Sequence, residues 1–501
     1  MKYSECTQLL EAGAVLGIVV RTMPRGRKRR DTVGKAARNT ILQLDLSART
    51  SGGANTQKRA ALEQTSAILT EARTFFLNFL LAHHEKLNER VSYYSEKHQE
   101  MREGLISANA LRSWLEECTV STKEHPHPFP DWDFKTCFPG MPIHARRAAM
   151  KEAIGKARAY LTALATWQKK GKKQGKPGFP GAADHPTFYQ GAFHLKLEEA
   201  KIHNRFVRLK VYDGRQWAWM NYPVRCSRHF QQRWHERGWK QQSPTLVLRG
   251  RQAALHFPQA KEVKAARVVD RKLDPHLVTV GVDLNVKNLA VVTVRQDEKI
   301  IEEIFLTDHG LDQTRYRHLK KIAKKQWQSG KPIKGEHSNQ QLWQHVRRTN
   351  EDAAHQVAHR IAGICAKYAG CVLVFERLRK IKPRGASKSR RMNRRVANQL
   401  RGKIRKYAGE KAYARSAVVT VEVNPHGTSQ YCSRCGARGE RFSFRGGQRI
   451  VEKWGKLFFC PVCHYQANAD HNASVNMHHS FYHEMHWQWR DTKGREPAPP
   501  G

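Results

Sequence analysis

The chain has 501 residues, 40% of them apolar, which predicts two to four domains and a sizeable hydrophobic core. It carries 89 Lys and Arg against 44 Asp and Glu, a formal net charge of +45. A surplus of this size indicates a polyanionic partner, and nucleic acid is the first candidate. A cationic protein on a membrane surface is the rival. The sequence contains no run of about 18 uncharged apolar residues, so we expect no membrane-spanning helix.

Residues 1–38 are predicted to form a basic extension. An apolar stretch at 9–20 comes before a basic cluster at 21–30, the reverse of the order in a secretory signal, so we expect a cytoplasmic protein. The run Arg25–Arg30 has five basic residues in six, which is typical of a solvated arm. A nucleic-acid contact is the alternative.

The next segments favour a strand and then helices. Residues 40–49 alternate apolar and polar side chains, as a strand does. A helical pattern covers residues 56–87, and further helical sequence continues to about Gln168, with breaks at two proline-rich stretches. Residues 169–181 are a basic Gly/Pro linker.

From about residue 187 to 269 the hydrophobic period changes to two, which predicts short strands in a small antiparallel barrel that also pairs with the strand at 40–49. Three aromatic residues there, Trp217, Trp219 and Tyr222, are expected in the core. Stacking on nucleic-acid bases is the alternative.

The sequence after residue 277 indicates a mixed α/β sheet covered on both faces. Two apolar strands are joined by NVKN, a hairpin-like turn. The other predicted elements are helices at 314–328 and 340–369, strands at 371–375 and 417–423, and a helix beginning near 470.

Three carboxylates belong to this predicted sheet. Asp283 and Glu376 lie at or near the ends of buried strands, and Asp470 opens the last helix. A lone buried Asp is usually structural, and Asp470 alone fits an N-cap. Burying two strand-borne acids is unfavourable unless a cation compensates them. Converging carboxylates suit hard divalent cations, so the three predict a catalytic site with Mg²⁺, with two ions about 4 Å apart. Hydrolysis of nucleic-acid strands would follow from this arrangement.

Four cysteines form a second candidate metal site. Cys432 and Cys435 make one CxxC pair, Cys460 and Cys463 make another, and 24 residues separate the pairs. In a reducing compartment this pattern predicts a tetrahedral Zn²⁺ ribbon rather than disulfides. Four thiolates leave no open position on the metal, so we expect the zinc to be structural.

Residues 377–409 contain 14 Lys and Arg and no acid. A solvated surface is the usual explanation of a charge run, yet one of this length and sign favours binding to a phosphate backbone. The residues predicted to contact nucleic acid are Arg377, Arg379, Lys380, Arg390, Arg391, Arg394 and Arg395, together with Arg434 on the ribbon.

The order of these motifs resembles a known family. GVDLNVKNLA, VFERL, VNPHGTSQYCSRCG and FFCPVCHYQANADHNAS resemble the catalytic half of the TnpB and compact type V CRISPR effector nucleases. The resemblance covers residues 278–477 well and the N-terminal half more weakly. It departs at Asn285, where Gly is frequent, at Gly427, which replaces an aromatic residue, and at Asn468, which replaces an acid.

The resemblance implies a multidomain α+β protein: a wedge β-barrel with a helical recognition lobe, and an RNase H-like RuvC nuclease domain of mixed α/β structure with an inserted four-cysteine zinc ribbon. Asp283, Glu376 and Asp470 take the catalytic positions, and the four cysteines take the zinc positions. The expected domains are an extension (1–38), the wedge barrel (39–55 plus 185–270), the recognition lobe (56–184), the RuvC-like nuclease (271–425 plus 467–480), the zinc ribbon (426–466) and a tail (481–501).

The leading functional hypothesis is an RNA-guided, Mg²⁺-dependent DNA endonuclease in a prokaryotic cytoplasm, associated with the nucleoid. Its expected partners are a guide RNA, either crRNA or transposon-derived RNA, and target double-stranded DNA. A monomer and a homodimer are both open, and no membrane partner is expected. The second hypothesis is an RNA-guided binding protein that silences or recruits without efficient cleavage. A ribosomal-type RNA-binding protein would not explain the three acids, and a transposase lacks a recognisable nucleophile.

Overall fold

The computed structural model describes residues 31–46, 54–95, 99–123, 125–126, 129–169, 171, 175–180, 185–196, 206–285, 288–307, 310–330, 339–378, 400–452 and 455–482. The chain divides into an N-terminal unit, Ala37–Lys261, and a C-terminal unit, Glu262–Gly501 together with Met1–Ala36. In the ranges above, no helix combines the length and the apolar character that crossing a membrane requires.

The N-terminal unit contains a seven-stranded sheet with the order β4-β5-β6-β1-β9-β7, and β8 pairs with β9. Its strands are β1 (Asp31–Leu44), β4 (Phe193–Lys196), β5 (Phe206–Tyr212), β6 (Trp217–Arg225), β7 (Lys240–Gln241), β8 (Thr245–Arg249) and β9 (Gln252–Ala266). The predicted pairing of the first strand with later ones is confirmed, since β1 pairs antiparallel with β6. β1 begins earlier than predicted and ends at Leu44, before the predicted end at residue 49.

Among the described strands the sheet is an open path rather than a closed barrel. An isolated antiparallel bridge between Thr187 and Thr245 joins the segment before β4 to β8, so the sheet curves back toward itself. Tyr222 is fully buried in this core, as predicted, and its hydroxyl donates to the carbonyl of Lys58 at 3.2 Å. Trp219 is half-buried beside Arg208, whose guanidinium lies 5.3 Å from the ring centroid.

The helices of the N-terminal unit form a second core, except α7 (Arg228–Trp234), which packs with the sheet core through Phe230 and Trp234. The other helices are α2 (Ala54–Ala82), α3 (His84–Asn88), α4 (Ala108–Thr119), η2 (Pro130–Trp132), α5 (Phe134–Cys137) and α6 (Ile143–Lys169). Aromatic residues of α2 and α5 pack together, with the rings of Phe76 and Phe134 stacked at 4.8 Å. Arg73 is buried on α2 and pairs with Glu152 of α6 at 2.8 Å.

The prediction of continuous helical sequence after residue 87 is wrong. Residues 90–105 form a hairpin of β2 (Arg90–Ser95) and β3 (Glu100–Leu105). Most residues of both strands are exposed on both faces, so the sequence has no alternation of apolar and polar residues to reveal the strands. The long helix also ends at Ala82, because His83 leaves the helical conformation before α3 begins.

The C-terminal unit is built on a five-stranded sheet with the order β12-β11-β10-β13-β14. β10 (Thr279–Asp283), β11 (Asn288–Gln296) and β12 (Lys299–Thr307) pair antiparallel, and β13 (Val372–Glu376) and β14 (Val419–Val423) join parallel to β10. The helices are α8 (Val268–Arg271), α9 (Leu311–Gln328), α10 (Gln340–Cys365), α12 (Arg401–Ser416) and α13 (Ala469–Tyr482). The predicted mixed α/β sheet with its first hairpin is confirmed.

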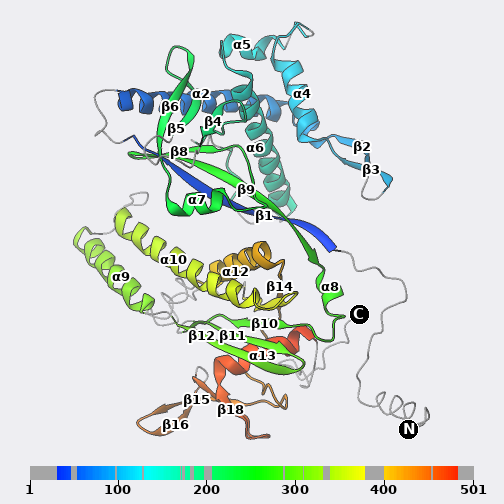
Figure 1. Cartoon of the computed structure of the whole chain (residues 1–501), viewed down its shortest axis with the longest axis vertical. Helices are drawn as coiled ribbons and strands as arrows, with labels where there is room; N and C mark the ends of the chain where they lie inside the picture. Colours follow the sequence, from blue (N-terminus) through cyan, green and yellow to red (C-terminus); the bar gives the residue numbers. More distant parts are fainter. Residues whose placement is uncertain are drawn as a thin grey trace. The chain divides into compact units, whose positions relative to one another are not determined.

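Both faces of this sheet are covered (Figure 1). Val280 and Val282 of β10 point to one face and pack with residues of α10 and α12. On the other face, Val372 and Val374 of β13 pack with Met477 and Phe481 of α13. Residues alternate between faces along each strand, so this assignment also fixes the face on which the strand-end acids lie.

Candidate functional site

Asp283 and Glu376 end two neighbouring parallel strands at the same level. The register of β10 and β13 pairs Gly281 with Val374 and Val282 with Phe375, so the two acids are the next residues in line. Each lies two positions beyond a residue on the face covered by α13, and therefore points to that face. The sheet thus places two carboxylates side by side at one edge.

The third acid comes to this face from the first turn of α13. The helix begins at Ala469, directly after β18 (Gln466–Asn468). Asn468 supplies its cap, because the side-chain oxygen accepts from the backbone N–H of Asp470 at 2.8 Å. An N-cap role for Asp470 itself is therefore wrong. Its carboxylate pairs instead with Arg441, at 3.7 Å between Oδ1 and Nη2.

Burial and mutual repulsion make this a strained set of charges. Asp283 is 9% exposed, and burial, followed by the charges of Glu376 and Asp470, raises its pKa well above the ordinary value. Burial also raises the pKa of Glu376. Arg401, at the start of α12, acts against both shifts, and Arg441 acts on Asp283. A bound cation would stabilise the ionised acids in the same way.

Two residues around the acids escaped prediction as site residues. Thr428 donates a hydrogen bond to Glu376 Oε1 at 2.5 Å. Arg401 belongs to the basic run 377–409, and nothing in the sequence distinguishes it from the other basic residues of that run. A Thr four residues before the first ribbon Cys was visible in TSQYC, but only the fold shows that it reaches Glu376.

The four cysteines of the ribbon lie together. One ligand atom from each of Cys432, Cys435, Cys460 and Cys463 falls within 4.8 Å of all the others. Within the ranges that the structure describes, no other group of three or more His, Cys, Asp or Glu is this tight, so the three carboxylates are spread more widely.

The thiol geometry fits a tetrahedral metal. The Sγ atoms of Cys432 and Cys463 are 3.5 Å apart, as are those of Cys435 and Cys460. Zn–S bonds of about 2.3 Å in a tetrahedron give S···S distances of about 3.8 Å, close to those of this cluster. The backbone N–H of Arg434 also points at Cys432 Sγ at 3.4 Å, which stabilises a thiolate.

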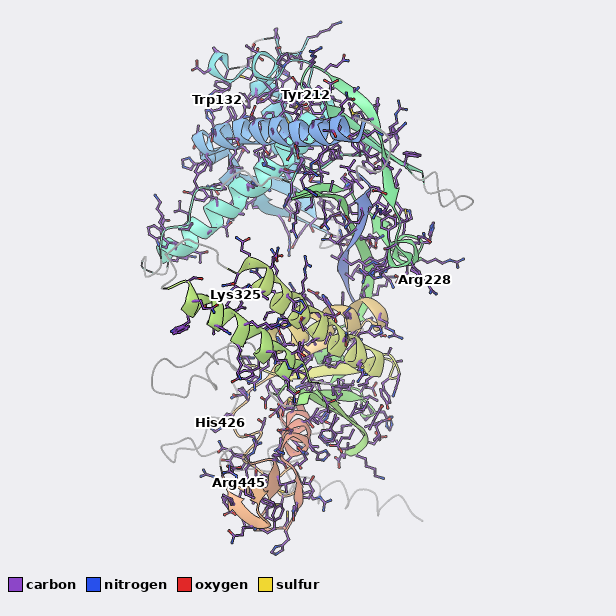
Figure 2. All side chains as sticks on the ribbon, turned by 90° about the vertical axis from the view of Figure 1, so that its left-hand side faces the viewer. Trp132, Tyr212, Arg228, Lys325, His426 and Arg445 are labelled. Atoms are coloured by element: carbon purple, nitrogen blue, oxygen red, sulfur yellow. The ribbon has the colours of Figure 1, made fainter. Side chains whose placement is uncertain are left out.

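A small sheet with the order β16-β15-β17-β18 supports the cysteines. Its strands are β15 (Glu440–Arg445), β16 (Gln448–Val451), β17 (Leu457–Phe459) and β18. Arg445, at the end of β15, is labelled in Figure 2 and pairs with Glu452 at 2.6 Å. The side chain thus lies on the surface of the ribbon.

Of the predicted nucleic-acid contacts, two lie in the described ranges. The side chain of Arg377 is 62% exposed and lies 3.9 Å from Glu422. The guanidinium of Arg434 lies over the ring of Tyr465, 4.4 Å from its centroid. The other six, Arg379, Lys380, Arg390, Arg391, Arg394 and Arg395, lie outside the described residues.

A separate cavity of about 1810 Å³ belongs to the N-terminal unit and not to the carboxylate site. Its lining includes the cations Lys151 and Arg208, the amides Asn221 and Gln241, and the ring of Trp234. This mixture of cationic, amide and aromatic groups suits a polar ligand rather than a purely apolar one.

Comparison with known proteins relates both halves of the chain to described families. The model of the Aq_aa04 family matches residues 49–213, and that of the Cas12f1-like TNB domain matches residues 402–477. The second range contains the four cysteines and Asp470. The TnpB-like protein aq_aa05 of Aquifex aeolicus (strain VF5) is 32% identical in an alignment of 256 residues that covers 48% of this chain and 78% of that protein.

The chain belongs to the TnpB and compact type V effector family. An uncharacterised protein, aq_aa04, from the same strain is 28% identical to this TnpB-family chain over 170 residues, 32% of the chain and 91% of that protein. Cas12f1, solved with sgRNA and target DNA, is 13% identical with a TM-score of 0.46 and covers 88% of this chain and 98% of its own. The mini RNA-guided endonuclease Cas_phi3 is 11% identical with a TM-score of 0.43, covering 95% of this chain and 97% of its own.

Proposed function

We propose that this TnpB-family protein is an RNA-guided, Mg²⁺-dependent DNA endonuclease. It pairs a bound guide RNA with target double-stranded DNA and hydrolyses phosphodiester bonds at one RuvC-like site. The observation that carries this proposal is the gathering of three acids from distant parts of the sequence, Asp283, Glu376 and Asp470, at one end of the five-stranded sheet. A purely structural role would not require three carboxylates that repel one another.

The sheet supports assignment of the C-terminal unit to the RNase H-like, RuvC-type fold. Three antiparallel strands followed by two parallel ones, with helices on both faces, fit that architecture. We assign the N-terminal sheet and α7 to the wedge domain and helices α2 to α6 to the recognition lobe, with the domain limits expected from the sequence except that β1 begins at Asp31.

The donor set suits Mg²⁺, because all three acids offer hard oxygen ligands. Burial raises the pKa of Asp283 and Glu376 in the absence of a cation, so a bound cation would stabilise their ionised forms. Two Mg²⁺ ions, when bound, supply an activated water and charge stabilisation of the leaving oxygen. Strands β10 and β13 hold the carboxylates of Asp283 and Glu376 at a fixed spacing, and α13 would add the carboxylate of Asp470 as a third ligand. Arg401 and Arg441 balance the negative charge nearby.

The zinc of this proposal is structural and binds at Cys432, Cys435, Cys460 and Cys463. Guide RNA and target DNA account for the net charge of +45, since pairing supplies the sequence and the protein supplies charge and shape. We assign the seven predicted basic residues of 377–395, Lys380 among them, and Arg434 to contacts with the nucleic-acid backbone.

Cleavage of a target plasmid tests this proposal. Protein purified with its co-expressed RNA should cut a plasmid that carries the RNA's guide sequence, with Mg²⁺ and not with EDTA. Asp283→Ala should abolish cutting and leave RNA affinity unchanged within about twofold, because the substitution removes a ligand and no basic residue. Asp297→Ala, at a surface Asp that pairs with His276, is the control and should cut normally.

The same assay separates the alternative. A protein that binds the plasmid at the guided site with Mg²⁺ present, and leaves it neither nicked nor linear, is an RNA-guided binding protein. Cutting by the Asp283→Ala variant would disprove the site assignment. Sequencing of the co-purified RNA identifies a crRNA by its repeat and a transposon-derived RNA by its transposon end, and finding no enriched RNA contradicts guided recognition.

A further inference from the structure

Residues on one side of helix α13 have nearly the same spacing as residues on one face of strand β10. Asp470, Ser474 and His478 are four residues apart on the helix, so they share one stripe, about 6 Å from one to the next. Asp283, Gly281 and Thr279 are two residues apart on β10, so they share one face, about 6.7 Å apart. The two spacings agree closely enough for three successive pairs of residues, which we call rungs: Asp470 with Asp283, Ser474 with Gly281, and His478 with Thr279.

The middle rung requires a glycine. A Cβ atom at Gly281 would lie 2.8 Å from the backbone oxygen of Ser474 and 2.8 Å from Nε2 of His478. Such distances are too short for any carbon, so the helix approaches β10 only because residue 281 has no side chain. Gly281 therefore sets the height of α13 above the sheet.

The last rung is a directional polar clamp. His478 is fully buried, and its Nδ1 lies 2.7 Å from Thr279 Oγ1 while its Nε2 lies 2.9 Å from Thr293 Oγ1. A neutral imidazole offers one donor and one acceptor, and each Thr hydroxyl can serve either role. Thr279 lies on β10 and Thr293 on β11, so one side chain ties the helix to both strands.

The apolar contacts of α13 do not provide this direction. Met477 and Phe481 pack against Val372 and Val374, and such apolar packing holds the helix on the sheet without specifying where it stops along β10. Other hydrogen bonds of α13 reach different elements: His471 lies 2.5 Å from Glu303 on β12, and Asn472 and Asn476 donate to the carbonyl of Tyr431. The hydrogen bonds of His478 reach β10 itself, the strand of Asp283, and so specify that point. The first rung, Asp470 opposite Asp283, is then placed by the other two.

We propose that His478 is a positioning residue, which together with Gly281 fixes α13 over β10 so that Asp470 faces Asp283 across the metal site. This inference rests on the proposed function in taking the three acids as metal ligands. It adds that the buried polar clamp determines their spacing, and hence the affinity for the metal.

Substitutions at Thr293 test the clamp without adding volume. Thr293→Val keeps the shape and removes the hydroxyl, whereas Thr293→Ser keeps the hydroxyl and removes a methyl group. Binding of Mn²⁺ to the zinc-loaded, RNA-free full chain is measured by calorimetry, with Asp283→Ala as the background of unspecific sites. We expect Thr293→Val to weaken Mn²⁺ binding about tenfold, as loss of a supporting hydrogen bond at a metal site does, and Thr293→Ser to stay within about twofold.

Gly281→Ala tests the height of the helix. Its matched control is Gly363→Ala on α10, where an added Cβ has only Arg415 Nη1 within 4 Å, at 3.9 Å. We expect Gly281→Ala to weaken Mn²⁺ binding about 10- to 100-fold and Gly363→Ala to leave it unchanged. Circular dichroism and the melting temperature show whether each variant is folded, and an unfolded Gly281→Ala leaves the Thr293 pair to decide.

Two results with the Thr293 variants would overturn the inference. One is normal Mn²⁺ binding by Thr293→Val. The other is weaker Mn²⁺ binding by Thr293→Ser than by Thr293→Val, which would mean that packing and not the hydrogen bond positions the helix. A wild-type chain that binds no Mn²⁺ at these acids also overturns it. A wild-type chain that binds Mn²⁺ but leaves guided plasmid intact contradicts the proposed function alone, and the Thr293 comparison still decides the clamp.

Discussion

Thr428 donates its hydroxyl hydrogen to Glu376 Oε1 at 2.5 Å, and so connects the second acid of the site to the segment that leads into the cysteine ribbon. The same hydroxyl also lies 3.1 Å from the carbonyl oxygen of Pro425. The hydrogen bond to Glu376 favours the ionised carboxylate and lowers its pKa against the effect of burial. Glu376 is therefore oriented from the ribbon side as well as by its strand.

Loss of this hydroxyl should impair cleavage more than folding. We expect Thr428→Val to raise the Mg²⁺ concentration for half-maximal cleavage about tenfold, because Glu376 loses the group that orients it. Thr428→Ser should restore most of the activity. Initial cleavage rates across a Mg²⁺ titration measure the effect, and a normal titration by the Val variant would mean that strand β13 alone orients Glu376.

Arg401 should stabilise the metal-free protein more than the metal-bound one. Its guanidinium acts on Asp283 and Glu376, so Arg401→Met leaves two buried carboxylates with less compensation. We expect the metal-free variant to melt about 5 °C or more below the wild type, and Mg²⁺ to recover more of that loss than it adds to the wild type. Lys406→Met, at a mostly exposed position of the same helix, is the control.

The ribbon should depend on its metal. The buried cluster around the cysteines consists of Cys432, Phe458, Cys460 and Ala469, two of which are proposed ligands. Phe442 of β15 is also buried, but so few apolar side chains give little packing without zinc. We expect Cys435→Ser to lose bound zinc and to become sensitive to protease between residues 426 and 466. Cys137→Ser, at an exposed cysteine of the N-terminal unit, should do neither. Zinc content and limited proteolysis provide the two measurements.

Acid should weaken the helices of the N-terminal unit through Glu116. Burial acts to raise the pKa of this carboxyl, but hydrogen bonds from Arg147 and Arg146, at 2.9 and 3.2 Å, outweigh it and lower the pKa. A carboxyl with a lowered folded-state pKa stabilises the fold above its ordinary pKa, and that contribution disappears as the pH falls through the folded-state value.

Glu116→Gln should therefore reduce the melting temperature at about pH 7 by about 2–4 °C, for a loss of about 1 kcal/mol. The further decrease on lowering the pH to about 3 should be smaller in the variant than in the wild type, because the variant has no proton to take up there. Glu103→Gln, at an exposed site, is the control. Equal decreases in both proteins would mean that other acids govern acid stability.

The positions of Asp283 and Glu376 at the ends of strands were predictable, because each acid ends an apolar run in the sequence. Their adjacency depends on the parallel register of β10 and β13, which pairs residues 93 positions apart, since Thr279 lies opposite Val372. No local pattern contains that register. The ribbon was predictable because metal coordination demands a fixed spacing of ligands along the chain.

Polar residues that act across the fold were not predictable in this way. His478 has no distinguishing neighbours in NMHHSF, and its role follows only from its contacts with two threonines on different strands. Asn468 was interpreted from the sequence as a missing acid, whereas the structure uses its amide oxygen to cap α13. In both cases the role depends on a hydrogen bond. The residue type allows such a bond but does not specify its partner.

The direct junction of β18 and α13 limits how this protein can be shortened. Gln466–Asn468 is both the last strand of the ribbon and, through Asn468, the cap of the helix that carries Asp470. The backbone N–H of Ala469 also donates to the carbonyl of Lys456, inside the ribbon, at 2.9 Å. A compact version that removes the ribbon as a spare insertion would therefore lose the start of α13, and any linker that replaces it must rebuild that cap.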